Sequence, residues 1–172
     1  MGANRAEVVL PTREEALLVF GQCTNARVDV EAWNAHAVRF FSTRIGLTIE
    51  KRYELGIPPP SSDDFEFVVA PEDETSGIRS VFARPCEAND VDLADAADAR
   101  AGCTGLALVA RRCGMVWLVE RREPSDRLSF RLAAILASVL LGPILDGRAG
   151  ELFGVKTARA KLERMSPQTT RS

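Results

Sequence analysis

The chain contains one histidine, His36, and histidine is the side chain best suited to proton transfer near neutral pH. A histidine that acts as a general base needs an acid or a nucleophile within hydrogen-bond reach. On a helix such a partner lies three or four residues away, and those positions hold Ala32, Trp33, Arg39 and Phe40. The sequence therefore predicts a histidine at the edge of an apolar helix face, without a catalytic task.

The cysteines are too dispersed to predict a zinc site or a disulfide framework, since no two form a C-x-x-C pair. Cys113 follows Arg111 and Arg112, and cationic neighbours lower a thiol pKa. A nucleophile also needs a base, and the sequence shows none for it. An enzyme that uses Cys113 or His36 is the third functional alternative. The four thiols are expected to be reduced, and they are Cys23, Cys86, Cys103 and Cys113.

Three groups of acidic residues raise the question of metal binding or acid–base chemistry. They lie at 63–64, at 72–74 and at positions 90, 92, 95 and 98. None has the spacing of a calcium-binding loop, so we expect solvated charges in turns and on a helix face. The glycines of the 102–105 segment follow a predicted helix instead of leading into one, which excludes a phosphate-binding loop. We predict no catalytic residue, no metal and no cofactor.

The bulk composition predicts one domain over residues 11–165, with flexible tails at 1–10 and 166–172. The chain has 172 residues, is 46% hydrophobic and 27% charged, and carries a formal net charge of −2. A slightly acidic chain has no electrostatic attraction to nucleic acid or to an anionic membrane. No secretory signal is visible at the N-terminus, and arginine is far commoner than lysine. We expect a protein of a bacterial cytosol, with neither nucleic acid nor membrane as partner.

Hydrophobic periodicity and turn residues predict an α+β fold with an antiparallel sheet of about five strands and helices packed mainly on one face. The expected order is α-α-β-β-β-α-β-β-α-α. The predicted helices are 12–20, 29–45, 89–101, 128–145 and 149–165. The predicted strands are 47–55, 65–69 and 78–83, followed by a hairpin of 106–110 with 116–119.

The helix predicted at 128–145 is apolar over most of its circumference. Residues 132–145 contain no charge, yet the segment is too short to span a membrane and Gly142-Pro143 interrupts it. A helix that is apolar all round is buried on every side. Either the C-terminal helix covers it or a second copy of the chain does. The second case predicts a homodimer with an interface at Leu132, Leu136, Val139 and Leu140.

The order helix-β-β-β-helix-β-β-helix resembles that of type III secretion chaperones, and residues 105–141 look like the end of a GAF-type sensory domain. The first resemblance implies a small dimeric protein that holds another protein, and the second implies a ligand pocket. Our leading expectation is a non-enzymatic protein-binding module, such as a chaperone, an adaptor or an immunity-type protein. The alternative is a small-molecule sensor whose pocket is lined by Phe67, Phe82, Trp117 and Phe130.

Overall fold

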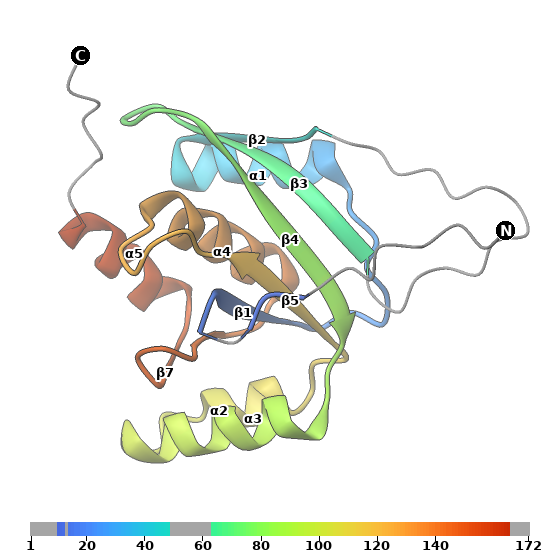
Figure 1. Ribbon diagram of the computed structural model, residues 1–172, viewed down its shortest axis with the longest axis vertical. Helices are drawn as coiled ribbons and strands as arrows, with labels where there is room; N and C mark the ends of the chain where they lie inside the picture. The colour runs from blue at the N-terminus through green and yellow to red at the C-terminus, as the bar shows by residue number, and fades with distance from the viewer. Residues whose placement is uncertain (1–9, 13, 49–62, 166–172) are drawn as a thin grey trace, which may run out of the picture.

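A computed structural model describes residues 10–12, 14–48 and 63–165, and these form a seven-stranded antiparallel sheet with five helices (Figure 1). The strand order across the sheet is β2-β3-β4-β5-β1-β6-β7. The strands are β1 (Ala16–Gly21), β2 (Thr43–Leu47), β3 (Asp63–Pro71), β4 (Gly77–Pro85), β5 (Met115–Glu120), β6 (Ile144–Asp146) and β7 (Glu151–Phe153). The helices are α1 (Val30–Phe41), α2 (Ala88–Arg100), α3 (Leu106–Ala110), α4 (Arg127–Leu140) and α5 (Val155–Arg164).

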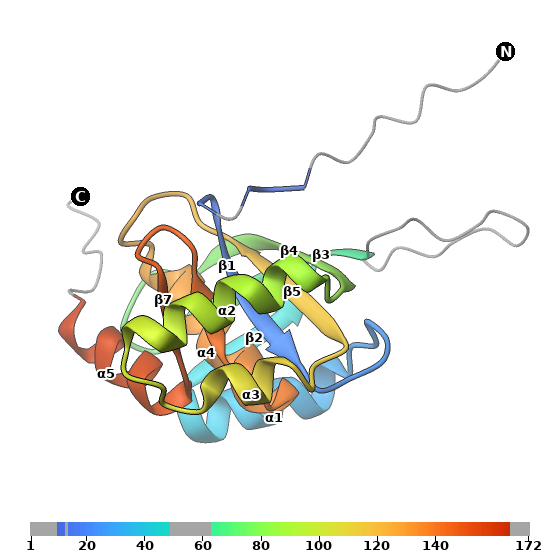
Figure 2. The same cartoon turned by 90° about the horizontal axis from the view of Figure 1, so that it is seen from below.

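Helices cover both faces of the sheet, whereas the sequence predicted mainly one. Helices α1, α4 and α5 pack on one face, and α2 and α3 pack on the other (Figure 2). The central strands therefore bury both their faces, and alternate residues of β1 belong to two separate core clusters. The sequence of a strand buried on both faces is a continuous apolar run, without the apolar–polar alternation of a half-exposed strand.

The first element is a strand, so the helix predicted at 12–20 is wrong. The local signal is real, because the Glu15 side chain accepts from the Thr12 amide at 3.0 Å. The chain makes this turn and then enters β1, which pairs with β5 on one side and β6 on the other. Two partner strands outweigh a local capping preference.

Helix α1 begins as predicted, with the Asp29 side chain accepting from the Ala32 amide at 3.2 Å. It ends at Phe41, because Ser42 adopts a left-handed conformation with φ 47°. The predicted end near Gly46 is wrong, since Ile45 and Gly46 lie in β2. Most of the strand predicted at 47–55 lies outside the described residues, as do the predicted tails apart from residue 10.

The structure confirms strands at 65–69 and 78–83 as parts of β3 and β4, and a helix at 89–101 as α2. The hairpin of 106–110 with 116–119 is wrong, because its first half is the short helix α3. Ala107 and Ala110 are the buried residues of α3, and a spacing of three is helical. Its second half is β5, which pairs with β1 and β4.

Helix α4 is buried all round within this chain, between the sheet, α1 and α5 (Figure 1). It begins after Asp126 and ends before Leu141, so the predicted 128–145 is too long at its C-terminal end. The single helix predicted at 149–165 is wrong in its first part, where β7 pairs with β6 before α5 begins. No helix among the described residues is long and apolar enough to cross a membrane.

The observed order is β-α-β-β-β-α-α-β-α-β-β-α. It departs from the predicted order in its first element, in α3 and in the hairpin of β6 with β7. It also departs from the element order on which the resemblance to type III secretion chaperones rested.

Candidate functional site

His36 contacts a serine that lies far away in the sequence. Its Nε2 is 2.7 Å from the Oγ of Ser138, and its ring packs against Phe40 at 4.7 Å between centroids. Burial lowers the pKa of His36, and the cations of Arg159 and Arg39 lower it further. Ser138 lies in the last turn of α4, where a helix presents carbonyl groups and not the amides that stabilise an oxyanion. The pair therefore ties α1 to α4 and lacks the surroundings of a nucleophile.

Cys113 is buried, and burial raises its pKa to about 11. Its thiol donates to the Val109 carbonyl at 3.3 Å. The expectation that neighbouring cations lower this pKa is wrong, because burial of the thiol dominates and raises it. The adjacent Arg111 pairs with Asp95 of α2 at 2.7 Å. A thiol in this state is a weak nucleophile.

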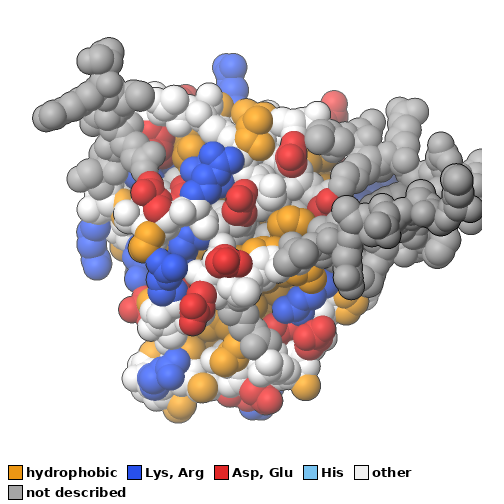
Figure 3. All heavy atoms as spheres, viewed as in Figure 1, with side chains coloured by type: hydrophobic (Ala, Val, Ile, Leu, Met, Phe, Trp, Pro, Cys, Tyr) orange, Lys and Arg blue, Asp and Glu red, His pale blue; other side chains and the backbone are white. Residues whose placement is uncertain are grey.

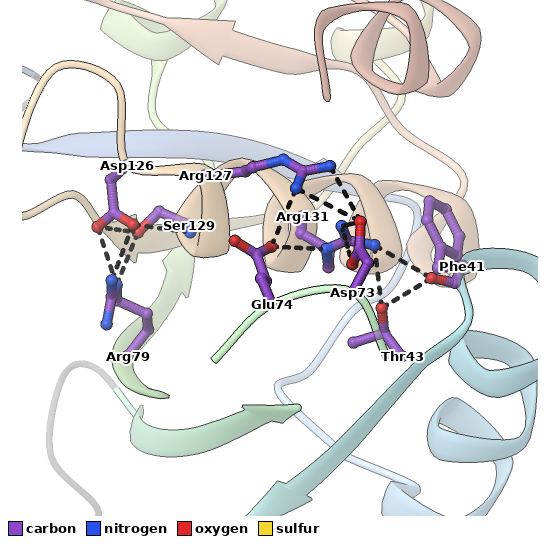
Figure 4. Close-up of polar contacts among 9 residues, drawn as sticks. All are labelled: Phe41, Thr43, Asp73, Glu74, Arg79, Asp126, Arg127, Ser129 and Arg131. Atoms are coloured by element: carbon purple, nitrogen blue, oxygen red, sulfur yellow. Dashed lines mark hydrogen bonds and ion pairs between the residues drawn. The ribbon is translucent and has the colours of Figure 1, made fainter. Parts of the chain in front are cut away.

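A network of buried arginines and carboxylates lies along α4 (Figure 4). The Asp126 carboxylate accepts two hydrogen bonds from the Arg79 guanidinium, one from Nε at 2.9 Å and one from Nη2 at 2.8 Å. It also caps α4 by accepting a hydrogen bond from the Ser129 amide. Arg127, the first residue of α4, and Arg131, one turn later, form ion pairs with Asp73 and Glu74.

The second half of this network fixes the turn between β3 and β4 to α4. The carboxylate of Glu74 is 2% exposed, so the expectation that residues 72–74 are solvated is wrong for Glu74, whereas Asp73 is 54% exposed. A cavity of ≈ 450 Å³ opens beside the network. Three arginines and three carboxylates line this cavity. On the face seen in Figure 3 acidic and basic side chains are interspersed. This balance gives a charged ligand no net attraction, so we assign the network a structural role.

The acidic face of α2 is also occupied by structural contacts. Asp90 is fully buried and pairs with Arg84 at 2.6 Å. Asp98 accepts from Thr104 and from the amides of Gly105 and Ala107, which secures the loop into α3. No group of three metal-ligating side chains occurs among the residues that the structure describes.

The four aromatic residues predicted to line a pocket do not meet around one. Phe67 and Trp117 are fully buried, and both pack against Trp33 of α1. Phe130 stacks on Phe153 elsewhere in the same core cluster, whereas Phe82 packs on the opposite face of the sheet. None of the four lines any of the cavities described here.

The predicted interface residues lie on α4, which this chain itself covers. Leu132 and Leu136 are fully buried and Leu140 is 7% exposed, whereas Val139 is partly buried. Of the two alternatives that the sequence left open, cover by the C-terminal helix is the one found here, because α5 packs against α4.

The largest of the described cavities runs along the edge strand β7. Strand β7 pairs with β6 and has no second partner strand among the described residues. Beyond this edge α5 extends on one side, and the end of α2 with the loop into α3 extends on the other (Figure 1). The space between them measures ≈ 660 Å³, and we call it the β7 slot. It is lined by Ala97, Arg100, Ala101, Thr104, Leu106, Ala149–Phe153, Thr157, Lys161 and Arg164.

The opposite edge of the sheet has a helix packed beside it. Strand β2 is the other edge strand, and α1 packs beside it. The Ile45 amide donates to the Asn34 side chain of α1 at 2.9 Å, which occupies a backbone group that a further strand would need. Natural sheets cover or shorten their edges in this way.

An apolar groove adjoins the β7 slot. It measures ≈ 350 Å³ and lies between α3, the end of α4 and the start of α5. Leu106 lines both spaces. Leu141 lines the groove and is 67% exposed, the highest value among the exposed large apolar side chains of the described residues. We call it the Leu141 groove, and its lining is Leu106, Val109, Ala137, Ser138, Leu141–Pro143, Gly154 and Val155.

Leu141 occupies a backbone conformation that favours glycine. Its φ is 58°, in the left-handed region, at the C-terminal end of α4. For a residue with a Cβ this conformation is about 1–2 kcal/mol less favourable than the right-handed one, so many helices end in a left-handed glycine. The exposed Leu141 side chain recovers little of this cost through burial. Folding therefore does not explain the leucine, and departures of this kind concentrate at functional sites.

Sequence reasoning missed the slot and the groove because both are spaces between elements that come from distant parts of the chain. The one local signal was an apolar residue, Leu141, where a helix normally ends in glycine. No protein-family model matches the chain, and no curated protein or solved structure matches it either.

Proposed function

We propose that this protein is a non-enzymatic protein-binding module that holds an extended segment of a partner along the edge of β7. The observation that carries the proposal is an edge strand with a slot beside it that no described residue fills, between helices on both sides. An extended peptide can add to an exposed sheet edge through main-chain hydrogen bonds, as in several families of peptide-binding domains.

The slot runs beside all three residues of β7. Glu151–Phe153 line it, and a strand of this length spans about 10 Å. The walls are built from α2 and α5, which pack on opposite faces of the sheet. A strand entering between them continues the sheet and remains between the two helix layers.

The chemistry of the described residues supports binding over catalysis. The buried thiol of Cys113 has a raised pKa, and the His36–Ser138 pair lies at the carbonyl end of a helix. No observation favours the small-molecule sensor, whose four aromatic residues line none of these cavities. The expectation of a bacterial cytosol rests on composition and stays a prediction.

The proposal is tested by selecting ligands from a displayed library of random sixteen-residue peptides, with and without the slot filled. Thr157→Trp fills the slot from α5, where the side chain is exposed. Lys156→Trp is the matched control, because Lys156 is the exposed neighbour of Thr157 and lies outside the slot lining. Ala101→Trp, on the opposite wall, is a second filling variant. Circular dichroism confirms that each variant is folded.

We expect peptides that bind the wild type and Lys156→Trp alike, and that bind the two filled variants at least about tenfold more weakly, which is a loss of 1.4 kcal/mol. Hydrogen exchange of the β7 amides should slow when such a peptide binds. If the folded wild type selects no peptide, or if the filled variants bind the same peptides with unchanged affinity, the proposal is wrong.

A further inference from the structure

We infer that the segment held in the β7 slot is acidic and carries a bulky aliphatic side chain beside its acidic stretch. This inference rests on the function proposed above and names the chemistry of the partner. Three observations support it: the direction in which an added strand points its side chains, the charges on the two walls, and the apolar groove at one end.

An added strand presents successive side chains to the two walls in turn. Strand β7 shows this alternation, because Phe153 packs in the core cluster that includes α5 whereas Leu152 packs in the cluster that includes α2. A neighbouring strand has the same period of two. Adjacent residues of the ligand therefore face α5 and α2 alternately.

Both walls carry cations. On the α5 side Lys161 and Arg164 line the slot, and on the α2 side Arg100 lines it. Lys161 already pairs with Glu151 at 2.7 Å, and Arg100 donates to the Gly150 carbonyl at 3.0 Å. Arg164 forms no ion pair or hydrogen bond with any residue that the structure describes.

The side chains that line the slot carry a net positive charge. The lining holds three cationic side chains and one carboxylate, that of Glu151. Helices α2 and α5 both end at the slot, and each helix C-terminus contributes roughly half a negative charge. About one positive charge remains, and the guanidinium of Arg100 is neutralised only by a carbonyl dipole. Carboxylates are the side chains that complement this arrangement, because an arginine fork binds them through two hydrogen bonds.

The aliphatic requirement comes from the Leu141 groove. Leu106 lines both the groove and the slot, so a ligand that leaves the slot past Leu106 enters the groove. Val109 and Val155 form its walls, and the exposed Leu141 stands at its mouth. An aliphatic side chain of the ligand in this groove packs against Leu106 and Leu141.

The test compares the peptides selected from the same random library by three proteins. These are the wild type, the double variant Arg100→Glu/Arg164→Glu and the variant Leu141→Gly. Both arginines are exposed, so their replacement leaves the core intact, and glycine is compatible with the left-handed φ of residue 141. Peptides selected by the wild type are then synthesised with a fluorescent label, and their affinities are measured at low and high salt.

Wild-type ligands should be enriched in Asp and Glu over Lys and Arg, with one Leu, Ile or Met at a constant spacing from the acids. Their affinity should fall with salt, because the contacts are ionic and partly exposed. The double variant should select basic peptides, and Leu141→Gly should keep the acidic preference and lose the apolar position. If slot-dependent peptides are selected but show no excess of acids, this inference is wrong while the proposed function stands. If no peptide is selected at all, the proposed function fails first.

Discussion

Replacing Asp126 with asparagine should destabilise the fold strongly, because this carboxylate is the counter-ion of a buried arginine. The side chains of Arg79 and Asp126 are 8% and 2% exposed. Asp126 also accepts from the Arg122 amide at 3.0 Å and from the Ser129 hydroxyl at 2.7 Å. Asparagine has nearly the same shape and is an equally good N-cap. Both oxygens of Asp126 accept hydrogen bonds, so the substitution removes the charge and also turns one acceptor into an NH2 group that faces donors.

The expected loss in the free energy of unfolding is about 3–5 kcal/mol, the cost of leaving one partner of a buried ion pair without its counter-ion. Urea-induced unfolding followed by circular dichroism measures it. Asp95→Asn is the matched control, because the side chains of Asp95 and Arg111 are 33% and 53% exposed. An exposed pair contributes at most about 1 kcal/mol. If the two variants lose equal stability, burial does not set the strength of these pairs and the reasoning fails.

The same pair predicts how the difference depends on pH. Burial raises the pKa of Asp126, but the hydrogen bonds from Arg79, the Arg122 amide and Ser129 outweigh it, so the pKa lies below the ordinary value of 3.8. A carboxylate with a lowered folded-state pKa stabilises the fold fully above its unfolded-state pKa. That contribution disappears as the pH falls through the folded-state value. The stability gap between wild type and Asp126→Asn should therefore be constant near neutrality and shrink below about pH 4.

Two further predictions concern single positions. Gly142→Ala should cost more than about 3 kcal/mol in urea unfolding, because a Cβ there would clash with the Phe20 carbonyl oxygen, whereas Gly46→Ala has open space around it and should cost far less. Equal losses would contradict the close approach. In native buffer iodoacetamide should alkylate the exposed Cys103 well before the buried Cys113, whose pKa is about 11, and peptide mapping that finds equal rates would refute the buried thiol.

Local sequence signals identified the elements whose stability is mostly local. The Asp29 cap and the apolar spacing after it predicted the start of α1, and the alternation after Phe65 predicted β3. The absence of charge in 132–145 predicted that α4 is buried, because a helix that is apolar all round has no face for water. These inferences depend on neighbours within a few residues, and such neighbours are visible in the sequence.

The elements that were misread are those that distant partners decide. A turn at Thr12 looks like the start of a helix, and only pairing with β5 and β6 makes the following residues a strand. The same holds for β7, whose three residues are a strand only because β6 lies beside them. Short apolar runs have no preference strong enough to resist such contacts.

By itself the sequence determined a mixed α and β chain with a buried apolar helix, and it weighed against a metal site. Only the tertiary structure decided that Glu74 is buried between two arginines, that α5 covers α4 and that β7 ends the sheet inside a slot. The physical reason is the range of the interactions. Caps and periodicity act within a turn or two of helix, whereas ion-pair networks, sheet edges and grooves form between residues that only folding brings together.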